Sequence, residues 1–220
     1  MSTPSIVILI SGSGSNLQAI IDAVAEQRIH AQISAVISNR PDALGLEKAK
    51  IAGINTIVID HTHFDGREQF DEALIKQVAE LNPDLVVLAG FMRILPEKFI
   101  KQYEGRMLNI HPSLLPEFKG LHTHRRVLEA DHKQHGASVH FVSNELDSGA
   151  IVIQASLNIQ DDDETSLAAR VLKLEHIIYP LAIEWFVTGR LSLINNRVYF
   201  DNKPIKEIAS WQSSTLSLPR

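Results

Sequence analysis

The chain has 220 residues, 45% apolar and 21% charged, values that are typical of a globular protein with a sizeable core. Its formal net charge is −5, from 21 Lys and Arg against 26 Asp and Glu, and no segment carries a basic run, so large polyanions are poor partners. The absence of cysteine excludes disulfides and thiolate chemistry and fits a reducing compartment. The apolar run 6–10 is too short for a signal peptide or membrane span. We therefore expect a soluble, cytoplasmic protein that binds neither nucleic acid nor membrane.

Apolar segments alternate with amphipathic ones over the first half of the chain. Continuous apolar segments predict strands, and segments with an apolar stripe at helical spacing predict helices. The predicted strands cover residues 5–10, 33–38, 55–59, 85–89 and 107–110, and the predicted helices cover residues 15–26, 43–52, 67–81 and 96–103. Such strands, alternating with helices, indicate a parallel sheet that is covered on both faces.

The pattern changes after Pro116. The predicted helices now cover residues 123–130 and 164–187, and the predicted strands cover residues 137–142, 151–155, 191–194 and 197–200. We expect a single domain, residues 1–220, with an α/β fold: a Rossmann-like, mostly parallel sheet with helices on both faces, C-terminal antiparallel strands and one long helix. The polar tail after about residue 211 is a candidate for disorder.

Residues 11–17, Ser-Gly-Ser-Gly-Ser-Asn-Leu, join the first strand to the first helix. Glycines allow a sharp turn, and the free N–H groups at a helix start bind anions. A dinucleotide fingerprint would need glycine in place of Leu17 and an acidic residue within 38–40, and the Walker A lysine is also absent. The loop therefore favours a lone phosphate over NAD or ATP. The alternative is a tight turn in which Ser15 or Asn16 caps the helix.

Residues 89–96, Ala-Gly-Phe-Met-Arg-Ile-Leu-Pro, follow the fourth strand. An apolar loop at the carboxyl end of a central parallel strand indicates the wall of a pocket for a flat, partly apolar ligand. The alternative is that Phe91 and Leu95 simply pack under the next helix.

Asn109 and His111 stand at the end of the fifth strand, in the sequence Asn-Ile-His-Pro-Ser-Leu-Leu-Pro of residues 109–116. Alternate side chains of a strand share a face, and Pro112 has no N–H to continue the ladder, so both side chains point into the space beyond the strand. An amide and an imidazole that converge there can stabilise an oxyanion and move a proton. The alternative is a strand end with a capping Asn109 and an exposed His111.

Asp147 lies in the turn between two predicted strands, where aspartates ordinarily cap the backbone. If it lies beside His111, its carboxylate favours the imidazolium. Five further histidines, His122, His124, His132, His135 and His140, match no metal-binding spacing. The first four fall in a segment predicted as loop and surface helix, and His140 is expected to be structural with a supporting role. We predict no metal.

Residues 11–17, 90–95, 109–116, 122–125, 138–142 and 145–149 together resemble the folate-dependent formyltransferases. Within this superfamily the chain is similar to the phosphoribosylglycinamide formyltransferases of purine synthesis. The string of residues 109–116 with a downstream aspartate is specific for the superfamily, and Ser-Gly-x-Gly-Ser-Asn-Leu and His-Thr-His-Arg narrow the resemblance to this family. The likeness extends from the first strand to residues 179–181.

The resemblance assigns roles to individual residues and implies 10-formyltetrahydrofolate as co-substrate and phosphoribosylglycinamide as acceptor. The catalytic residues are Asn109, His111 and Asp147. The acceptor-binding residues are Gly14, Ser15, Asn16 and Glu175, although Glu175 would pass as a solvated helix residue from pattern alone. The residues of the formyl-folate site are Arg67, Met92, Arg93, Ile94, Leu95, Asn109 and Val142. Two residues depart from the family pattern: Asn144 replaces an aspartate and Ser148 replaces a glycine. Both flank Asp147, so the geometry of its turn is open at this point.

The mechanism that the resemblance implies is direct formyl transfer through a tetrahedral intermediate. Rival functions are another formyltetrahydrofolate-dependent formyltransferase, a deformylase, or a non-catalytic phosphate-binding α/β module. A methionyl-tRNA formyltransferase should carry a basic C-terminal domain and a deformylase an N-terminal regulatory domain, and a chain whose first strand starts at Ser5 and which ends at Arg220 is expected to lack both. The binding module explains residues 11–17 but not Asn109, His111 and Asp147. The oligomeric state stays open, with a homodimer among the candidates.

Overall fold

The computed structural model describes residues 3–212 and 215–219. Contacts divide the chain into two compact units, one ending at Leu108 and one beginning at Asn109, and each unit is described by itself. The prediction that residues 1–220 form a single domain stays a prediction. Among the described residues, no helix combines the length and the apolar character needed to cross a membrane.

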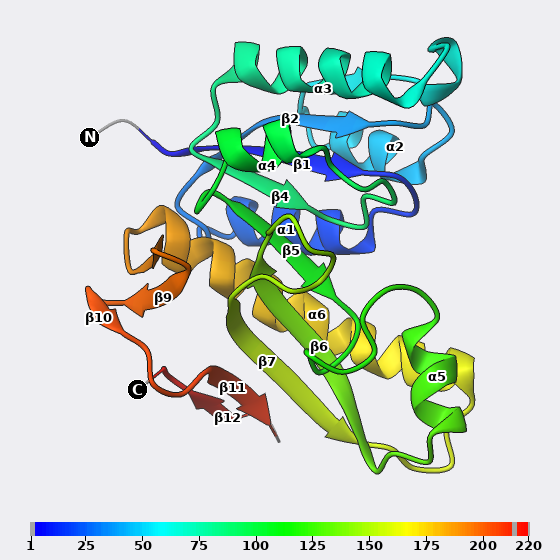
Figure 1. Ribbon diagram of the computed structural model, residues 1–220, viewed down its shortest axis with the longest axis vertical. Coiled ribbons are helices and arrows are strands. Elements are labelled where there is room, and N and C mark those ends of the chain that lie inside the picture. The colour runs from blue at the N-terminus through cyan, green and yellow to red at the C-terminus, as the bar shows by residue number, and fades with distance from the viewer. Residues whose placement is uncertain (1–2, 213–214, 220) are drawn as a thin grey trace. The chain divides into compact units, whose positions relative to one another are not determined.

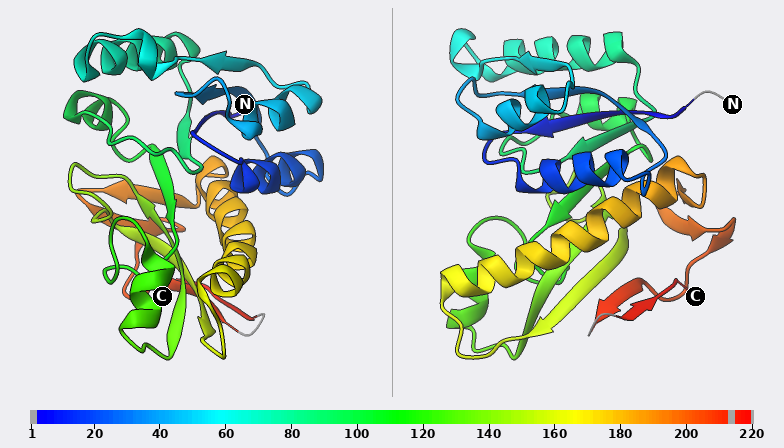
Figure 2. Two further views of the ribbon diagram at one scale, coloured as in Figure 1. Left: turned by 90° about the vertical axis from the view of Figure 1, so that its right-hand side faces the viewer. Right: turned by 180° about the vertical axis from the view of Figure 1, so that it is seen from behind.

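Parallel strands form the core of the first unit. They are β1 (Ser5–Ile10), β2 (Gln32–Ser38), β3 (Thr56–Val58) and β4 (Leu85–Leu88), in the spatial order β3-β2-β1-β4. The central strand β1 is fully buried from Ile6 to Ile10 because helices cover both faces of the sheet. As the left view of Figure 2 shows, α1 (Ser15–Ala25) and α2 (Leu44–Ile51) lie on one side of these strands, and α3 (Arg67–Leu81) and α4 (Glu97–Gln102) lie on the other. The loops after β1 and β4 leave from the carboxyl edge of the strands, where ligands bind in such sheets.

The second unit is built around strands in the order β12-β11-β7-β6-β5. The bounds are β5 (Met107–His111), which starts in the first unit, β6 (Gln134–Phe141), β7 (Ile151–Asn158), β11 (Ala209–Gln212) and β12 (Thr215–Ser217). β6 and β7 are antiparallel, β11 runs parallel to β7, and β12 returns antiparallel to β11. The long helix α6 (Glu164–Val187) packs on β6 and β7, and α5 (Thr123–Glu129) packs against α6 (Figure 1). The strands β8 (Leu191–Ile194), β9 (Arg197–Phe200) and β10 (Lys203–Pro204) form a separate antiparallel sheet.

The predicted fold class is confirmed, including the mostly parallel first half, the antiparallel C-terminal strands and the long helix. Several stretches differ from the expectation: β7 continues to Asn158 rather than ending at residue 155, and β10 was not expected. β6 starts at Gln134 rather than at residue 137, because the polar residues before Ala137 pair with the end of β7. Ordered strands β11 and β12 occupy part of the tail that we expected to be a candidate for disorder, because β11 pairs with β7. Residues 213–214 and 220 of that tail lie outside the described residues.

Candidate active site

The end of β5 presents the two polar side chains that the sequence singles out. Asn109 and His111 alternate on this strand, and Pro112 then stops the ladder. The chain turns at once, because the N–H of Ser113 donates to the carbonyl of His111 at 2.9 Å. His111 is buried, with 5% of its surface exposed, so the alternative of an exposed histidine at an ordinary strand end is wrong.

Both ring nitrogens of His111 face oxygen atoms that can only accept a hydrogen bond. Nδ1 lies 3.4 Å from Oδ2 of Asp147, and Nε2 lies 3.0 Å from the carbonyl oxygen of Phe118. A neutral imidazole has one N–H, so only the imidazolium donates to both partners. The side chain of Asp147 is 8% exposed, which removes the water that would otherwise screen this pair. The arrangement therefore favours a positively charged ring at the end of β5.

The turn that carries Asp147 is held against β6. Asp147 has a left-handed backbone (φ 49°), and its Oδ2 accepts the N–H of Gly120 at 2.9 Å. A Cβ at Gly149 would lie 1.7 Å from the carbonyl oxygen of Phe141, so only glycine allows the turn to approach this closely. Ser148, one of the two departures from the family pattern, accepts a hydrogen bond from Lys119 at 2.5 Å. The turn thus joins β6 to the loop that follows β5.

His140 belongs to the same cluster, a connection that its place in the sequence does not reveal. Its Nε2 lies 3.1 Å from Nδ2 of Asn109 and 3.8 Å from Oδ1 of Asp147. His140 is 2% exposed. In the sequence, His140 was noticeable only because it lies on a predicted strand beside the turn that carries Asp147. That position is consistent with the expected supporting role, but it does not say which residue His140 contacts.

The other histidines form no metal-binding group among the residues that the structure describes. His124 of α5 and His135 of β6 pair with each other instead, with 3.1 Å between Nδ1 and Nε2. The prediction that His135 lies in a loop or surface helix is wrong, because this residue is on β6 and is 1% exposed. Burial, and then the neighbouring His124, lower the pKa of His135 to about 4, and burial also lowers the pKa of His124.

In the first unit, the loop after β1 leaves the start of α1 without a side-chain cap. Gly14 is the N-cap residue, in a left-handed conformation (φ 66°), and no side chain accepts a hydrogen bond there. The alternative in which Ser15 or Asn16 caps the helix is therefore wrong, since both residues lie within α1. A Cβ at Gly14 would come within 2.6 Å of Cα of Gly45, so α2 packs directly on the turn. The first N–H groups of a helix have no partner within the helix, and an anion can bind them where no side chain caps the start.

The loop after β4 exposes large apolar side chains, as a ligand-binding wall would. Met92 and Ile94 are 71% and 59% exposed. The packing alternative concerned Phe91 and Leu95, of which Leu95 is buried and Phe91 is only partly buried. The side chain of Arg67 holds this loop by donating to the carbonyl oxygen of Ile94 at 2.9 Å, and the guanidinium of Arg93 lies 4.3 Å from the ring centre of Phe70.

A second contact connects this wall to the loop after β1. The hydroxyl of Ser11 accepts the N–H of Met92 at 2.8 Å and donates to Oδ1 of Asn39 at 2.6 Å. The ends of β1, β2 and β4 are thereby tied together through one hydroxyl group. The two predicted binding loops of the first unit are therefore parts of one hydrogen-bonded edge.

The two remaining predicted residues lie in the second unit. Val142 follows the last residue of β6 and is partly buried. Glu175 is on α6 and is 7% exposed, so the pattern-based reading of a solvated helix residue is wrong. A carboxylate this deeply buried on a helix needs a polar environment or a ligand.

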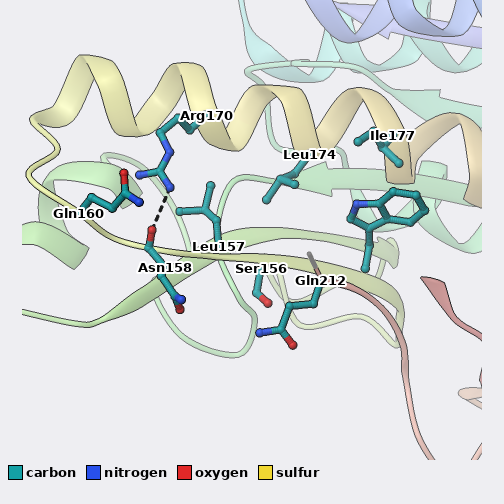
Figure 3. Close-up of a pocket in the computed structure, with 9 residues that line it drawn as sticks. Ser156, Leu157, Asn158, Gln160, Arg170, Leu174, Ile177 and Gln212 are labelled. Atoms are coloured by element: carbon teal, nitrogen blue, oxygen red, sulfur yellow. Dashed lines mark hydrogen bonds between the residues drawn. The ribbon is translucent and has the colours of Figure 1, made fainter. Parts of the chain in front are cut away.

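A cavity of about 370 Å³ in the second unit contains none of the predicted site residues. Figure 3 shows it between α6, β7 and β11, with Leu174, Ile177 and Arg170 on the helix side and Gln212 on the strand side. Arg170 is already engaged by the carbonyl oxygen of Asn158 at 2.9 Å and by Asp162. This cavity is separate from the cluster at the end of β5.

Comparison with known proteins identifies the family. A family model described as formyl transferase matches residues 5–183. The chain is 52% identical over 200 residues to the phosphoribosylglycinamide formyltransferase of Escherichia coli, which covers 90% of this chain and 94% of that protein. It is 47% identical to the Haemophilus influenzae protein of the same name, over 91% of this chain and 95% of that protein.

A solved structure agrees with the sequence comparisons. The phosphoribosylglycinamide formyltransferase of Coxiella burnetii superposes with a TM-score of 0.88 and 49% identity, covering 93% of this chain and 96% of that one. The resemblance inferred from the sequence motifs is confirmed. The chain therefore belongs to the formyltransferase family, and within it to the phosphoribosylglycinamide formyltransferases.

Proposed function

We propose that this chain transfers the formyl group of 10-formyltetrahydrofolate to the glycyl amine of phosphoribosylglycinamide, a step of purine biosynthesis, by direct attack of the amine on the formyl carbon. The bond from the amine nitrogen to the formyl carbon forms, the bond from that carbon to N10 of the folate breaks, and one proton passes from the amine toward N10. The observation that carries this proposal is the buried cluster of Asn109, His111 and Asp147, in a chain of this family.

The cluster supplies what the attack requires. Negative charge develops on the formyl oxygen, and N–H groups of the His111 imidazolium and of the Asn109 amide can stabilise it. Asp147 keeps the ring charged and offers a route for the proton that leaves the amine. Since both N–H directions of His111 already end on protein oxygens, substrate has to displace one of them. The carbonyl of Phe118 is the partner that sits on a loop.

The binding roles are proposed for groups of the first unit and for three residues of the second. We assign the phosphate of the acceptor to the N–H groups around Gly14, Ser15 and Asn16, because no side chain caps that helix start. Glu175 would contact the glycinamide part of the acceptor. The exposed apolar loop after β4 and the guanidinium of Arg67 suit a flat ring system with carboxylates. The residues proposed for the formyl-folate site are Arg67, Met92, Arg93, Ile94, Leu95, Asn109 and Val142.

A covalent acyl-enzyme is a poor alternative for this chain. The sequence contains no cysteine. The hydroxyl of Ser113, which follows the catalytic segment, donates to the carbonyl oxygen of Glu117 at 2.7 Å and is completely buried. A nucleophilic serine needs a base to accept its proton, and this one has a backbone carbonyl instead. The gain in rate is then expected from holding two ligands together over a preorganised oxyanion site.

The test is a formyl-transfer assay with three acceptors: phosphoribosylglycinamide, initiator Met-tRNA and water. We expect turnover with phosphoribosylglycinamide and only background consumption of formyl folate with the other two. Turnover with water alone would make the chain a deformylase, and turnover with the tRNA would make it a tRNA formyltransferase. Calorimetric titration adds a binding control, because NAD and ATP should not bind specifically.

Four further expectations stay predictions: a cytoplasmic location, the absence of a metal, the lack of a nucleic-acid partner and a homodimer. Light scattering across a concentration series would measure the oligomeric state. Metal analysis of the purified protein, with and without chelator, would test for a bound metal, and activity should survive the chelator.

A further inference from the structure

The side-chain amide of Asn109 can face a substrate in two ways that have nearly the same shape. If the amide nitrogen faces the reacting oxygen of the substrate, the amide donates a hydrogen bond to that oxygen. If the amide oxygen faces it, the two oxygen atoms repel each other. An oxyanion site must therefore contain a group that decides which end of the amide faces the substrate. The neighbours of Asn109 identify this group.

His140 has the hydrogen-bonding polarity that this task requires. Its Nδ1 lies 2.9 Å from the carbonyl oxygen of Phe141, which can only accept, so Nδ1 carries the proton. In the neutral ring, Nε2 then has a lone pair, and it lies 3.1 Å from Nδ2 of Asn109. One N–H of the amide donates to this lone pair. The second N–H of the same nitrogen is the one that a substrate oxygen can receive.

The surroundings of His140 keep the ring neutral. Burial lowers the pKa of His140, and the charge on His111 lowers it further. The carbonyl of Phe141 and the carboxylate of Asp147 act in the opposite direction, but burial is the largest effect. A protonated ring would point an N–H at the N–H groups of Asn109 and would be drawn to Oδ1 of Asp147, 3.8 Å away. The neutral form is therefore the one that is compatible with a donating Asn109.

The local fold holds the ring in this position. The pairing of β6 with β7 shifts register between Val139 and His140, which re-aims the side chain at this point of the strand. A Cβ at Gly149 would lie 3.4 Å from Nδ1 of His140, so the glycine lets the Asp147 turn pack over the ring. The ring is thus confined by its own strand and by the turn.

We propose that His140 is a positioning residue, which fixes the Asn109 amide with its nitrogen toward the reacting oxygen. The proposal rests on the proposed function, in which Asn109 stabilises the oxyanion. His140 itself touches neither substrate in this scheme. Its contribution is made through Asn109, so it should appear in turnover rather than in binding.

Two variants of similar polarity separate positioning from general structural support. His140→Gln can place a carbonyl oxygen near the position of Nε2 and accept from Asn109, while His140→Asn is too short to reach it. We expect His140→Asn to lower kcat by about 10- to 100-fold, a part of what an oxyanion donor contributes, with KM for both substrates little changed. His140→Gln should retain most of the activity. Equal losses in both variants, or a loss that falls mainly on KM, would overturn the proposal.

A double-mutant cycle tests whether His140 acts through Asn109. In an Asn109→Ala background, His140→Asn should cause no further loss of kcat, because the group that it positions is gone. Additive losses would overturn the positioning role while leaving the catalytic role of Asn109 intact. If Asn109→Ala alone kept full turnover, the proposed function of Asn109 would fail instead, so the two failures are distinguishable.

A spectroscopic measurement keeps the proposal testable even if a variant does not fold. The ¹⁵N shifts of histidine side chains in the unmodified protein, with His140 assigned, report which nitrogen is protonated. We expect a neutral ring protonated at Nδ1 at neutral pH, without substrate. A ring protonated at Nε2, or at both nitrogens, could not accept from Asn109 and would overturn the proposal.

Discussion

The two units of the chain offer different kinds of groups to a ligand. In residues 3–108 the candidate binding groups are backbone N–H groups at the start of α1 and exposed side chains such as Met92 and Ile94. In residues 109–219 they are buried side chains that contact one another, as His111 contacts Asp147. Backbone groups and exposed surfaces suit binding, since they need little adjustment to a ligand. Buried, mutually oriented side chains suit chemistry, since a low-dielectric setting strengthens their electrostatic effect.

Replacing His111 should produce the largest effect. His111→Ala removes the charged donor from the oxyanion site, and we expect kcat to fall by about 10²- to 10⁴-fold. The affinity for both ligands should change little, because the binding groups of the first unit are untouched. Steady-state kinetics together with calorimetric titration of each ligand check this separation. Near-normal turnover would show that the buried cluster does not carry the chemistry.

Asp147→Asn should have a smaller effect on the same step. The substitution preserves the size of the side chain and removes the charge that faces Nδ1 of His111 at 3.4 Å. We expect activity to fall by at least about tenfold, the scale of proton-transfer contributions, with both ligands still bound. Wild-type turnover in this variant would reduce Asp147 to a turn residue. Comparison with Asp147→Ala would separate the loss of charge from the loss of the Gly120 contact.

The contrast between the units also explains what the sequence could predict. Local patterns were sufficient for the helices Arg67–Leu81 and Glu164–Val187, whose observed bounds match the predicted ones. At the start of α6 the Asp163 carboxylate accepts the N–H of Ser166, as acidic residues at a helix start suggest. The glycine-rich loop after β1 could also be predicted, because the residues that indicate it are adjacent in the sequence.

Long-range contacts account for what the sequence could not predict. The distance from Asp147 to His111 depends on how a turn after β6 packs beside β5, which no local pattern encodes. His135 was misassigned because its neighbours are polar, although pairing with β7 buries it. β11 was missed because a short strand with polar residues becomes recognisable only through its partner. Glu175 was unremarkable in sequence because burial on a helix depends on what packs against it.

Gly14→Ala tests the binding side of the comparison. The new Cβ would approach Cα of Gly45 to 2.6 Å in a backbone with φ 66°. We expect a loss of about 1–3 kcal/mol in the free energy of unfolding, from strain. KM for phosphoribosylglycinamide should rise several-fold while kcat changes less, because only the phosphate loop moves. Gly12→Ala is the matched control, since a Cβ there meets nothing within 4 Å. If Gly14→Ala instead lowered mainly kcat, the assignment of binding to the first unit and of chemistry to the second would be contradicted.

The buried histidines should make the second unit the more sensitive to acid. The pKa of His135 is about 4 in the folded protein and 6.5 for an ordinary histidine, so the unfolded chain binds a proton in this window that the folded chain does not. Stability should therefore be lost as pH falls from 6.5 toward 4, by up to about 1.4 kcal/mol per pH unit for one proton. Hydrogen exchange should show β6 and α5 losing protection before β1 and β2. His135→Gln should flatten this dependence.

Ser148→Ala should have the smallest effect, and it tests which contact holds the loop after β5 on the Asp147 turn. The substitution removes the hydroxyl that receives the hydrogen bond from Lys119, but the bond from the N–H of Gly120 to the buried carboxylate of Asp147 remains. A partly exposed contact of this kind contributes about 1 kcal/mol or less, so we expect kcat/KM to change by less than about fivefold. Tryptic cleavage after Lys119 should accelerate only slightly. A large loss of activity with rapid cleavage would mean that the contact between Lys119 and Ser148, and not the Asp147 carboxylate, orders the loop beside His111.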